Sequence, residues 1–153
     1  MWSVVVAAVL VVSTLVWMPV SPVGAWSSDD GAVAVFGGTS TDMSHSVAVD
    51  SSGNVYTTGY FAGTVDFDPG SGTTNLTSNG SQDVFVSKLD SSGDLVWAKS
   101  FRSTSSIGSD YGYSVAVDSS GNVYTTGYFA GTVDFDPGSG TTNLTSNGSH
   151  DVF

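Results

Sequence analysis

The sequence predicts an all-β protein built from a repeated unit, and three observations support this fold class. Residues 46–85 return as residues 114–153, an offset of 68 residues, and the two copies differ only at Gln82 and His150. Within each copy, apolar and polar residues alternate over short runs, as β-strands require. The 14 acidic residues are all Asp, which favours turns, and Glu, a helix former, is absent. A fixed long period of this kind is typical of repeat architectures.

Composition excludes several classes of function. Three Lys and Arg residues leave a net charge of −11, which repels the phosphate backbone of nucleic acids and anionic membranes. We therefore expect no nucleic-acid partner, and the acidity fits the solubility of a secreted protein. Cysteine is absent, so neither a disulfide framework nor a thiolate metal site is available, and packing alone must hold the fold.

The N-terminal stretch predicts secretion. Residues 4–20 are apolar except for Ser13 and Thr14, and small residues end this stretch at 23–25. This pattern favours a signal peptide over residues 1–25, although its start lacks Lys and Arg. A membrane anchor is the alternative, but Pro19 leaves a marginal length for a membrane span. We expect cleavage, which places the mature chain at residues 26–153.

Each period contains four runs with the alternation of a strand, at residues 46–50, 54–61, 83–89 and 95–101. Apolar groups lie on both faces of these runs, so we expect sheets that are covered on both sides. The side chains expected to be mostly buried are those of Val47, Val49, Val55, Val84, Val86 and Trp97. The connection at residues 62–82 is rich in Gly, Thr, Asn and Ser. Residues 63–67 are expected to form either a short extra strand or an extension of the strand at 54–61, and the rest is expected to be an exposed loop.

Three connections have the residues of tight turns. Asp-Ser-Ser-Gly recurs at residues 50–53, 90–93 and 118–121, each time after a strand-like run. A type I turn that ends in a left-handed glycine, with the Asp side chain bonding backbone amides ahead of it, explains these letters. We therefore predict hairpins with positive φ at Gly53, Gly93 and Gly121.

Four strands per period, joined by hairpins and apolar on both faces, are the ingredients of a β-propeller blade. The predicted architecture is an incomplete propeller of about two four-stranded antiparallel blades. Residues 26–45 form a diverged blade end, because residues 27–36 resemble residues 91–101; residues 46–113 form the first blade and residues 114–153 a truncated second blade. Propellers close with about four to eight blades. The further blades are expected from a longer chain or from other copies of this one.

The letters of the repeat resemble a known family. Residues 50–59 read Asp-Ser-Ser-Gly-Asn-Val-Tyr-x-x-Gly, and residues 83–93 read Asp-Val-Phe-Val-x-Lys-Leu-Asp-Ser-Ser-Gly, followed by Leu-Val-Trp-Ala at 95–98. Together they resemble the SBBP-type β-propeller repeat over nearly all of residues 27–153. The resemblance implies tandem blades in secreted or cell-surface proteins of bacteria and archaea, and it carries no general catalytic residues. The long segment at residues 62–82 departs from the usual pattern.

One loop is a candidate cation site. Asp66 and Asp68 stand beside flexible Gly-rich backbone, and Asp134 and Asp136 repeat the arrangement. Carboxylate and carbonyl oxygens from such loops bind Ca²⁺. However, Asp-Pro-Gly is turn chemistry by itself and the EF-hand spacing is missing, so a plain turn is the favoured interpretation.

The remaining candidates point away from catalysis. His45 and His150 are each replaced one period away, as expected of surface residues, and most Asp residues lie in turns. Aromatics such as Tyr56, Tyr60, Phe61 and Trp97 are expected to pack between blades rather than to stack on sugars. We therefore expect a secreted or cell-surface, non-catalytic repeat module that acts as a scaffold or binding surface, with extracellular glycan or protein as its partner. The alternatives are a calcium-stabilised adhesin or lectin-like carbohydrate binder and, by analogy of fold alone, a secreted hydrolase.

Overall fold

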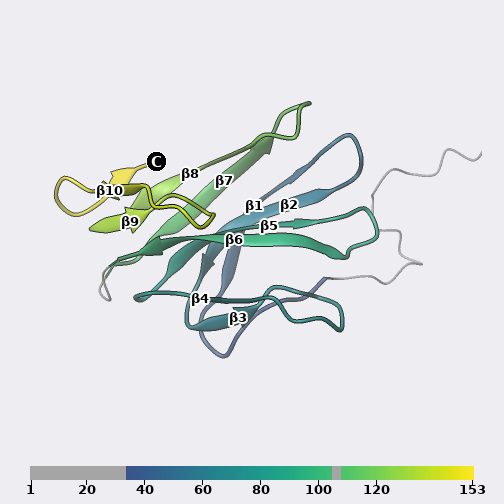
Figure 1. Cartoon of the computed structure of the whole chain (residues 1–153), viewed down its shortest axis with the longest axis horizontal. Helices are drawn as coiled ribbons and strands as arrows, with labels where there is room; N and C mark the ends of the chain where they lie inside the picture. Colours follow the sequence, from purple (N-terminus) through teal and green to yellow (C-terminus); the bar gives the residue numbers. More distant parts are fainter. Residues whose placement is uncertain (1–33, 105–107) are drawn as a thin grey trace, which may run out of the picture.

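The protein is an arrangement of antiparallel β-sheets, seen in a computed structural model that describes residues 34–104 and 108–153 (Figure 1). The predicted signal peptide at residues 1–25 lies outside the described residues. In the described residues every regular element is a strand, and the sheets do not close into a ring. The all-β prediction is therefore confirmed, and so is the incomplete propeller.

Eleven strands follow one another in the described chain. They are β1 (Met43–Val49), β2 (Val55–Phe61), β3 (Thr64–Asp66), β4 (Asn75–Thr77), β5 (Asp83–Leu89), β6 (Leu95–Ser103), β7 (Tyr111–Val117), β8 (Val123–Phe129), β9 (Thr132–Asp134), β10 (Asn143–Thr145) and β11 (Asp151–Val152). The first sheet has the order β1-β2-β5-β6-β9-β10, the second the order β11-β8-β7, and β3 pairs with β4. The four strands β1, β2, β5 and β6 are those predicted for one blade.

The tight turns form as the sequence predicts. Gly53, Gly93 and Gly121 have φ of 80°, 90° and 82°, which confirms the three left-handed glycines. In the first turn, Asp50 Oδ1 accepts hydrogen bonds from the backbone N–H groups of Ser52 (2.9 Å) and Asn54 (3.0 Å). The Asn54 side chain also donates to Asp50 Oδ2 at 2.7 Å. This side-chain bond most of all, together with the two backbone bonds, lowers the pKa of Asp50 to about 2.

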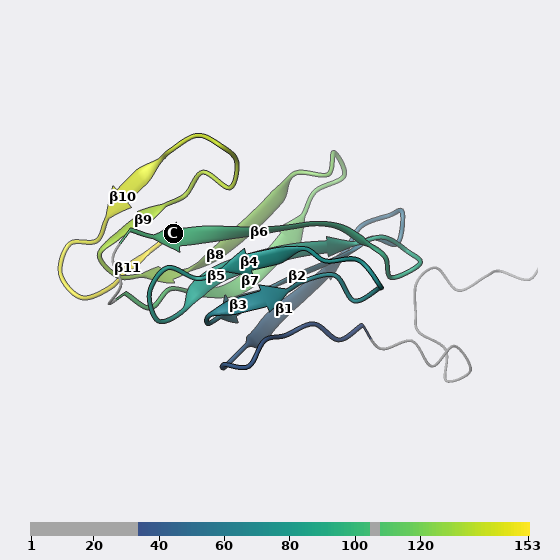
Figure 2. The same ribbon diagram turned by 60° about the horizontal axis from the view of Figure 1, so that its bottom comes forward.

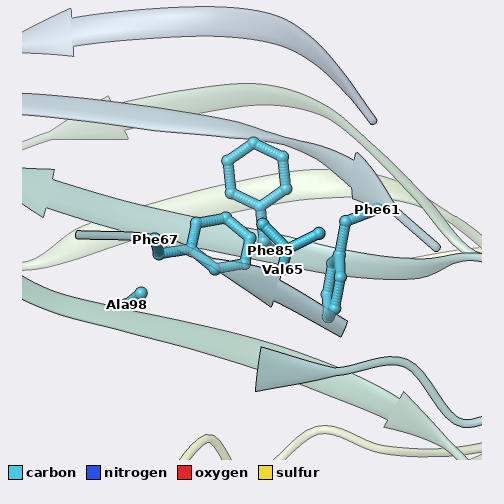
Figure 3. Packing of buried hydrophobic residues seen from close by; sticks show 5 residues of the cluster. All are labelled: Phe61, Val65, Phe67, Phe85 and Ala98. Carbon is cyan, nitrogen blue, oxygen red and sulfur yellow. The ribbon is translucent and has the colours of Figure 1, made fainter. Parts of the chain in front are cut away.

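The long connection at residues 62–82 contains the predicted short strand, and most of residues 68–82 are exposed, as predicted, but a second short strand that the sequence did not predict pairs with the first. Its residues form the β3–β4 hairpin, which lies against one face of the first sheet (Figures 1 and 2). Val65 and Phe67 are each 1% exposed, because they join Phe61, Phe85 and Ala98 in a core cluster (Figure 3). The hairpin thus covers part of a face that the four strands leave apolar.

The same hairpin in the second repeat has a different role in the sheets. Strand β9 pairs with the outer strand of the preceding repeat, with Asp134 opposite Arg102, so the first sheet gains β9 and β10 at its edge. In the first repeat Asp66 bridges Gly37 in the corresponding way.

Ring contacts repeat this relation between a hairpin and the segment before it. The rings of Phe36 and Phe67 are 5.2 Å apart, and those of Phe101 and Phe135, one period later, are 5.3 Å apart. Phe36 therefore lies against the first repeat as Phe101 lies against the second.

Candidate binding surface

The two repeats stack through one apolar interface. Tyr56 and Val86 of the first sheet pack against Val115 of the second, and all three are buried. Around them lie the partly buried side chains of Ala48, Trp97, Val117 and Val123. Figure 1 shows the second sheet, β7 and β8, running along the first. This interface is the contact between successive blades that the repeat predicts. Its buried centre consists of uncharged side chains, and Lys88 lies over the ring of Tyr56.

Polar and aromatic contacts line the same interface. His45 Nδ1 donates a hydrogen bond to the carbonyl oxygen of Gly112 at 2.8 Å. The Val115 N–H donates to Ser46 Oγ at 3.3 Å, and the rings of Tyr60 and Tyr111 meet at 4.5 Å. His45 is a surface residue, as predicted, with a specific partner one repeat away.

Gly112 marks the closest approach of the two sheets. A Cβ atom at this position would lie 2.5 Å from Thr58 Oγ1 and 3.0 Å from a methyl group of Val84. Only a residue without a side chain allows this contact. The first repeat has Ser44 at the corresponding position.

The part of the opposite face of the first sheet that the β3–β4 hairpin leaves uncovered is open. This face, here called the leading face, consists of Val47, Val49, Val55 and Thr57. Val47 is 63% exposed and Val49 54% exposed, while Val55 and Thr57 are half-buried. A groove of about 540 Å³ runs beside it, lined by residues that include Phe36, Val55, Thr57 and Phe61.

The structure buries two of the six side chains that were predicted to be mostly buried. Burial is confirmed for Val84 and Val86, whereas it is wrong for Val47 and Val49, and Val55 and Trp97 are half-buried. The physical reason is that β1 is an edge strand and that the β3–β4 hairpin covers only the part of this face near Phe61.

The second sheet also has an open face. This face, here called the trailing face, consists of Ala116, Tyr124 and Val152. Tyr124 is 59% and Val152 83% exposed, and Ala116 is exposed as well. The equivalent residues one period earlier are Ala48, Tyr56 and Val84, all on the stacked face of the first sheet.

The candidate calcium residues act as turn caps. Asp66 Oδ1 accepts hydrogen bonds from the N–H groups of Asp68 (3.1 Å) and Thr74 (2.8 Å), and Asp68 Oδ1 accepts one from Gly70 (2.8 Å). The described part of the chain holds no group of three His, Cys, Asp or Glu residues that could bind a metal ion.

Asp134 and Asp136 repeat these bonds in the second loop. Donation from the Thr142 and Asp136 N–H groups lowers the pKa of Asp134. The plain-turn interpretation accounts for this geometry, and the calcium site stays a prediction.

The aromatic candidates differ between the repeats. Tyr56, Tyr60 and Phe61 are buried in the first repeat, and Trp97 packs edge-on to Tyr56 at 6.1 Å. Stacking on a sugar is therefore closed to the three buried side chains. Tyr124, the counterpart of Tyr56, is open to solvent on the trailing face.

Sequence reasoning missed two buried carboxyl groups, those of Asp83 and Asp110, which are both 0% exposed. Asp83 accepts from the Asn79 N–H at 2.9 Å, and Asp110 Oδ1 from the Ala130 N–H at 3.0 Å. Asp110 Oδ2 has no hydrogen-bond partner among the residues that the structure describes.

Burial raises the pKa of both groups to about 6, and the charge of Asp110 adds to the shift at Asp83. A carboxyl with a raised pKa is a candidate acid or base only in a cleft. Asp110 lies at a contact between the repeats, where its N–H donates to the Gln82 carbonyl oxygen at 2.9 Å, and Asp83 is the residue after Gln82.

Within residues 34–104 and 108–153, no helix is long and apolar enough to cross a membrane.

Comparison with known proteins supports the resemblance. The family described as beta-propeller repeat, SBBP, matches residues 35–60 and 106–128. An uncharacterised WD repeat-containing protein of Acanthamoeba polyphaga mimivirus is 29% identical over 119 residues, which cover 67% of this chain and 8% of that protein. The chain thus spans a small part of the length of this relative. No solved structure matches the chain.

Proposed function

Two segments of the chain carry the SBBP β-propeller repeat, and on this basis we propose that the protein is a secreted or cell-surface repeat module that binds or scaffolds other proteins without catalysis. Repeat families of this type, the WD repeats of the viral relative included, are typically non-catalytic. Exposed apolar faces mark interaction sites on soluble proteins.

The observation that carries the proposal is the open leading face. Val47 and Val49 are more than half exposed on a sheet whose other face packs against the second sheet through Tyr56 and Val86. The adjoining groove of about 540 Å³ has the size of a small recognition pocket, and its lining is mostly apolar. A surface of this kind gains free energy when a partner covers it.

Site-specific photo-crosslinking tests this role. A photo-reactive residue at Val47 is expected to capture a protein partner on cells that produce the chain. The matched control is the same residue at Ser92, which is exposed in the turn between β5 and β6 and belongs to neither open face. Equal capture from both positions would contradict a binding role for the leading face.

Secretion requires its own experiment. The composition of residues 1–25 supports a cleaved signal peptide. The chain is expected outside the cytoplasm with Trp26 at its N-terminus, as read by mass spectrometry. Recovery of the uncleaved chain from the cytoplasm would contradict the proposed location.

A further inference from the structure

The leading and trailing faces correspond to the two faces that already pack together inside the molecule. Val47, Val49, Val55 and Thr57 are equivalent, one period earlier, to Val115, Val117, Val123 and Thr125. The first three members of that second set pack against the first sheet, and Thr125 Oγ1 lies 3.4 Å from Thr58 Oγ1. The trailing face is in turn equivalent to the stacked side of the first sheet.

From this equivalence, and resting on the binding role proposed above, we propose that the leading face of one copy of the chain binds the trailing face of a second copy. The contact is heterologous, since two different surfaces meet. Repetition of a heterologous contact closes a ring or extends into a filament. The internal interface supplies the geometry of the contact: the second copy, with its trailing face, takes the place of the first repeat, and the leading face takes the place of the second repeat.

The chemistry of the two faces fits this partner. Tyr124 of one copy would lie against Val47 of the next, as Tyr56 lies against Val115 within the chain. The side chains of both faces are uncharged, so their burial leaves no unpaired charge. Tyr56 and Val115 are 1% and 6% exposed in the internal contact, which shows how completely the equivalent residues can be covered.

One residue sets the fit between copies. Ser44 stands where the second repeat has Gly112, and a Cβ at Gly112 would meet Thr58 and Val84. In the contact between copies, the counterparts of these two residues are Thr126 and Val152. The Ser44 side chain therefore holds the second copy slightly away, and Ser44→Gly is expected to strengthen the association.

Net charge opposes the association from a distance. Each copy has a net charge of −11, so two copies repel one another in dilute buffer. Salt screens this repulsion while it leaves apolar burial intact. Association is therefore expected to strengthen as the salt concentration rises.

Sedimentation velocity on the full chain tests the proposal with two variants. Val47→Asp places a charge on the leading face, and Ala116→Asp places one on the trailing face. Both positions are exposed, so neither change is expected to unfold the protein, and a thermal melt checks this. Each variant alone is expected to associate at least about tenfold more weakly than the natural chain, because an unpaired charge would be buried.

A mixture of the two variants gives the decisive result. Each variant retains the face that the other has lost, so the mixture is expected to form a dimer that grows no further. The control Leu144→Asp adds a charge at an exposed apolar residue of the β9–β10 hairpin and is expected to associate as the natural chain does.

Three outcomes would overturn the proposal: a natural chain that stays monomeric at high protein and salt concentration, association that both variants retain, or a mixture that stays monomeric. If copies of the chain instead associate through the apolar residues 4–20, both variants retain association, which is the second of these outcomes. Capture of an unrelated protein by the photo-reactive residue at Val47 would support the binding role even if sedimentation rejects self-association. The two experiments therefore distinguish failure of one proposal from failure of the other.

Discussion

Val47 and Val115 are the same residue of two successive repeats, yet the Val47 side chain is 63% exposed and the Val115 side chain 6% exposed. Val115 is covered because it packs on Tyr56 and Val86 of the neighbouring sheet. Val47 has the same strand position and the same partner strand within its own sheet. The stacking of sheets, and not the strand itself, decides the burial of this residue.

Truncation of these two valines should therefore have unequal effects. Val115→Ala is expected to lower the free energy of unfolding by about 2 kcal/mol, because it opens a cavity between the sheets. Val47→Ala is expected to change it by less than about 0.5 kcal/mol, as for an exposed site. Urea denaturation at low protein concentration measures both values. An equal loss for the two variants would mean that the sheets are not stacked in solution.

Local sequence signals predicted the strands and turns of the repeat well. Alternation over residues 54–61 and 83–89 found the central strands, and Asp-Ser-Ser-Gly found the turns, because both signals act between residues close in sequence. Alternation shows that Val47 and Val49 share a face, but it does not show what covers that face. The prediction of their burial was wrong for this reason.

Contacts between segments that are distant in the chain could not be predicted from the sequence. The pairing of Asp134 with Arg102 joins a hairpin to the sheet of the preceding repeat, and the letters of residues 62–82 resemble an ordinary polar loop. Asp110, which is buried, also contacts a segment of the preceding repeat, since its N–H donates to the carbonyl oxygen of Gln82. Its counterpart Asp42 is only half-buried, so the repeat itself gives no signal for a buried carboxyl group.

The left-handed turn makes a second prediction. Gly53 has a φ of 80° and is buried, so Gly53→Ala is expected to lower the free energy of unfolding by about 1 kcal/mol or more. The control is Ser52→Ala, an exposed position in the same turn, with an expected change within about 0.5 kcal/mol. Chemical denaturation compares the two. A neutral Gly53→Ala variant would show that the turn relaxes without cost.

Calcium gives a third prediction. Asp66 and Asp68 already accept backbone hydrogen bonds that shape their turn. Millimolar Ca²⁺ is therefore expected to leave the melting temperature unchanged, since a cation that does not bind the folded state cannot stabilise it. Differential scanning calorimetry with Ca²⁺ and with excess chelator makes the comparison. A Ca²⁺-dependent rise that Asp68→Asn and Asp136→Asn abolish would establish the calcium site instead.

The buried carboxyl groups predict how stability depends on pH. The pKa of Asp83 and Asp110 is about 6 in the folded protein, mainly because of burial, against 3.8 as the ordinary value. Between about pH 6 and pH 4 the folded state therefore binds protons that the unfolded chain does not bind. The free energy of unfolding is expected to rise as the pH falls through this window, by on the order of 2 kcal/mol per carboxyl group.

Other carboxyl groups reverse this trend at lower pH. Hydrogen bonds lower the pKa of Asp50, Asp118 and Asp134 in the folded state, so the stability that they contribute is lost as the pH falls below about 4. Maximum stability is therefore expected near pH 4 to 5, as measured by urea denaturation across the pH range. Stability that falls steadily from pH 7 to pH 4 would contradict the burial of the two groups.

Asp110→Asn assigns this effect to one residue. The substitution removes a buried charge while the side-chain oxygen can still accept the hydrogen bond from Ala130. The variant is expected to be more stable than the natural protein at pH 7 and to lose about half of the gain between pH 6 and pH 4. Asp94→Asn, at an exposed position in a turn, is the matched control and is expected to keep the full gain. If both variants keep it, the proton that stabilises the fold binds elsewhere.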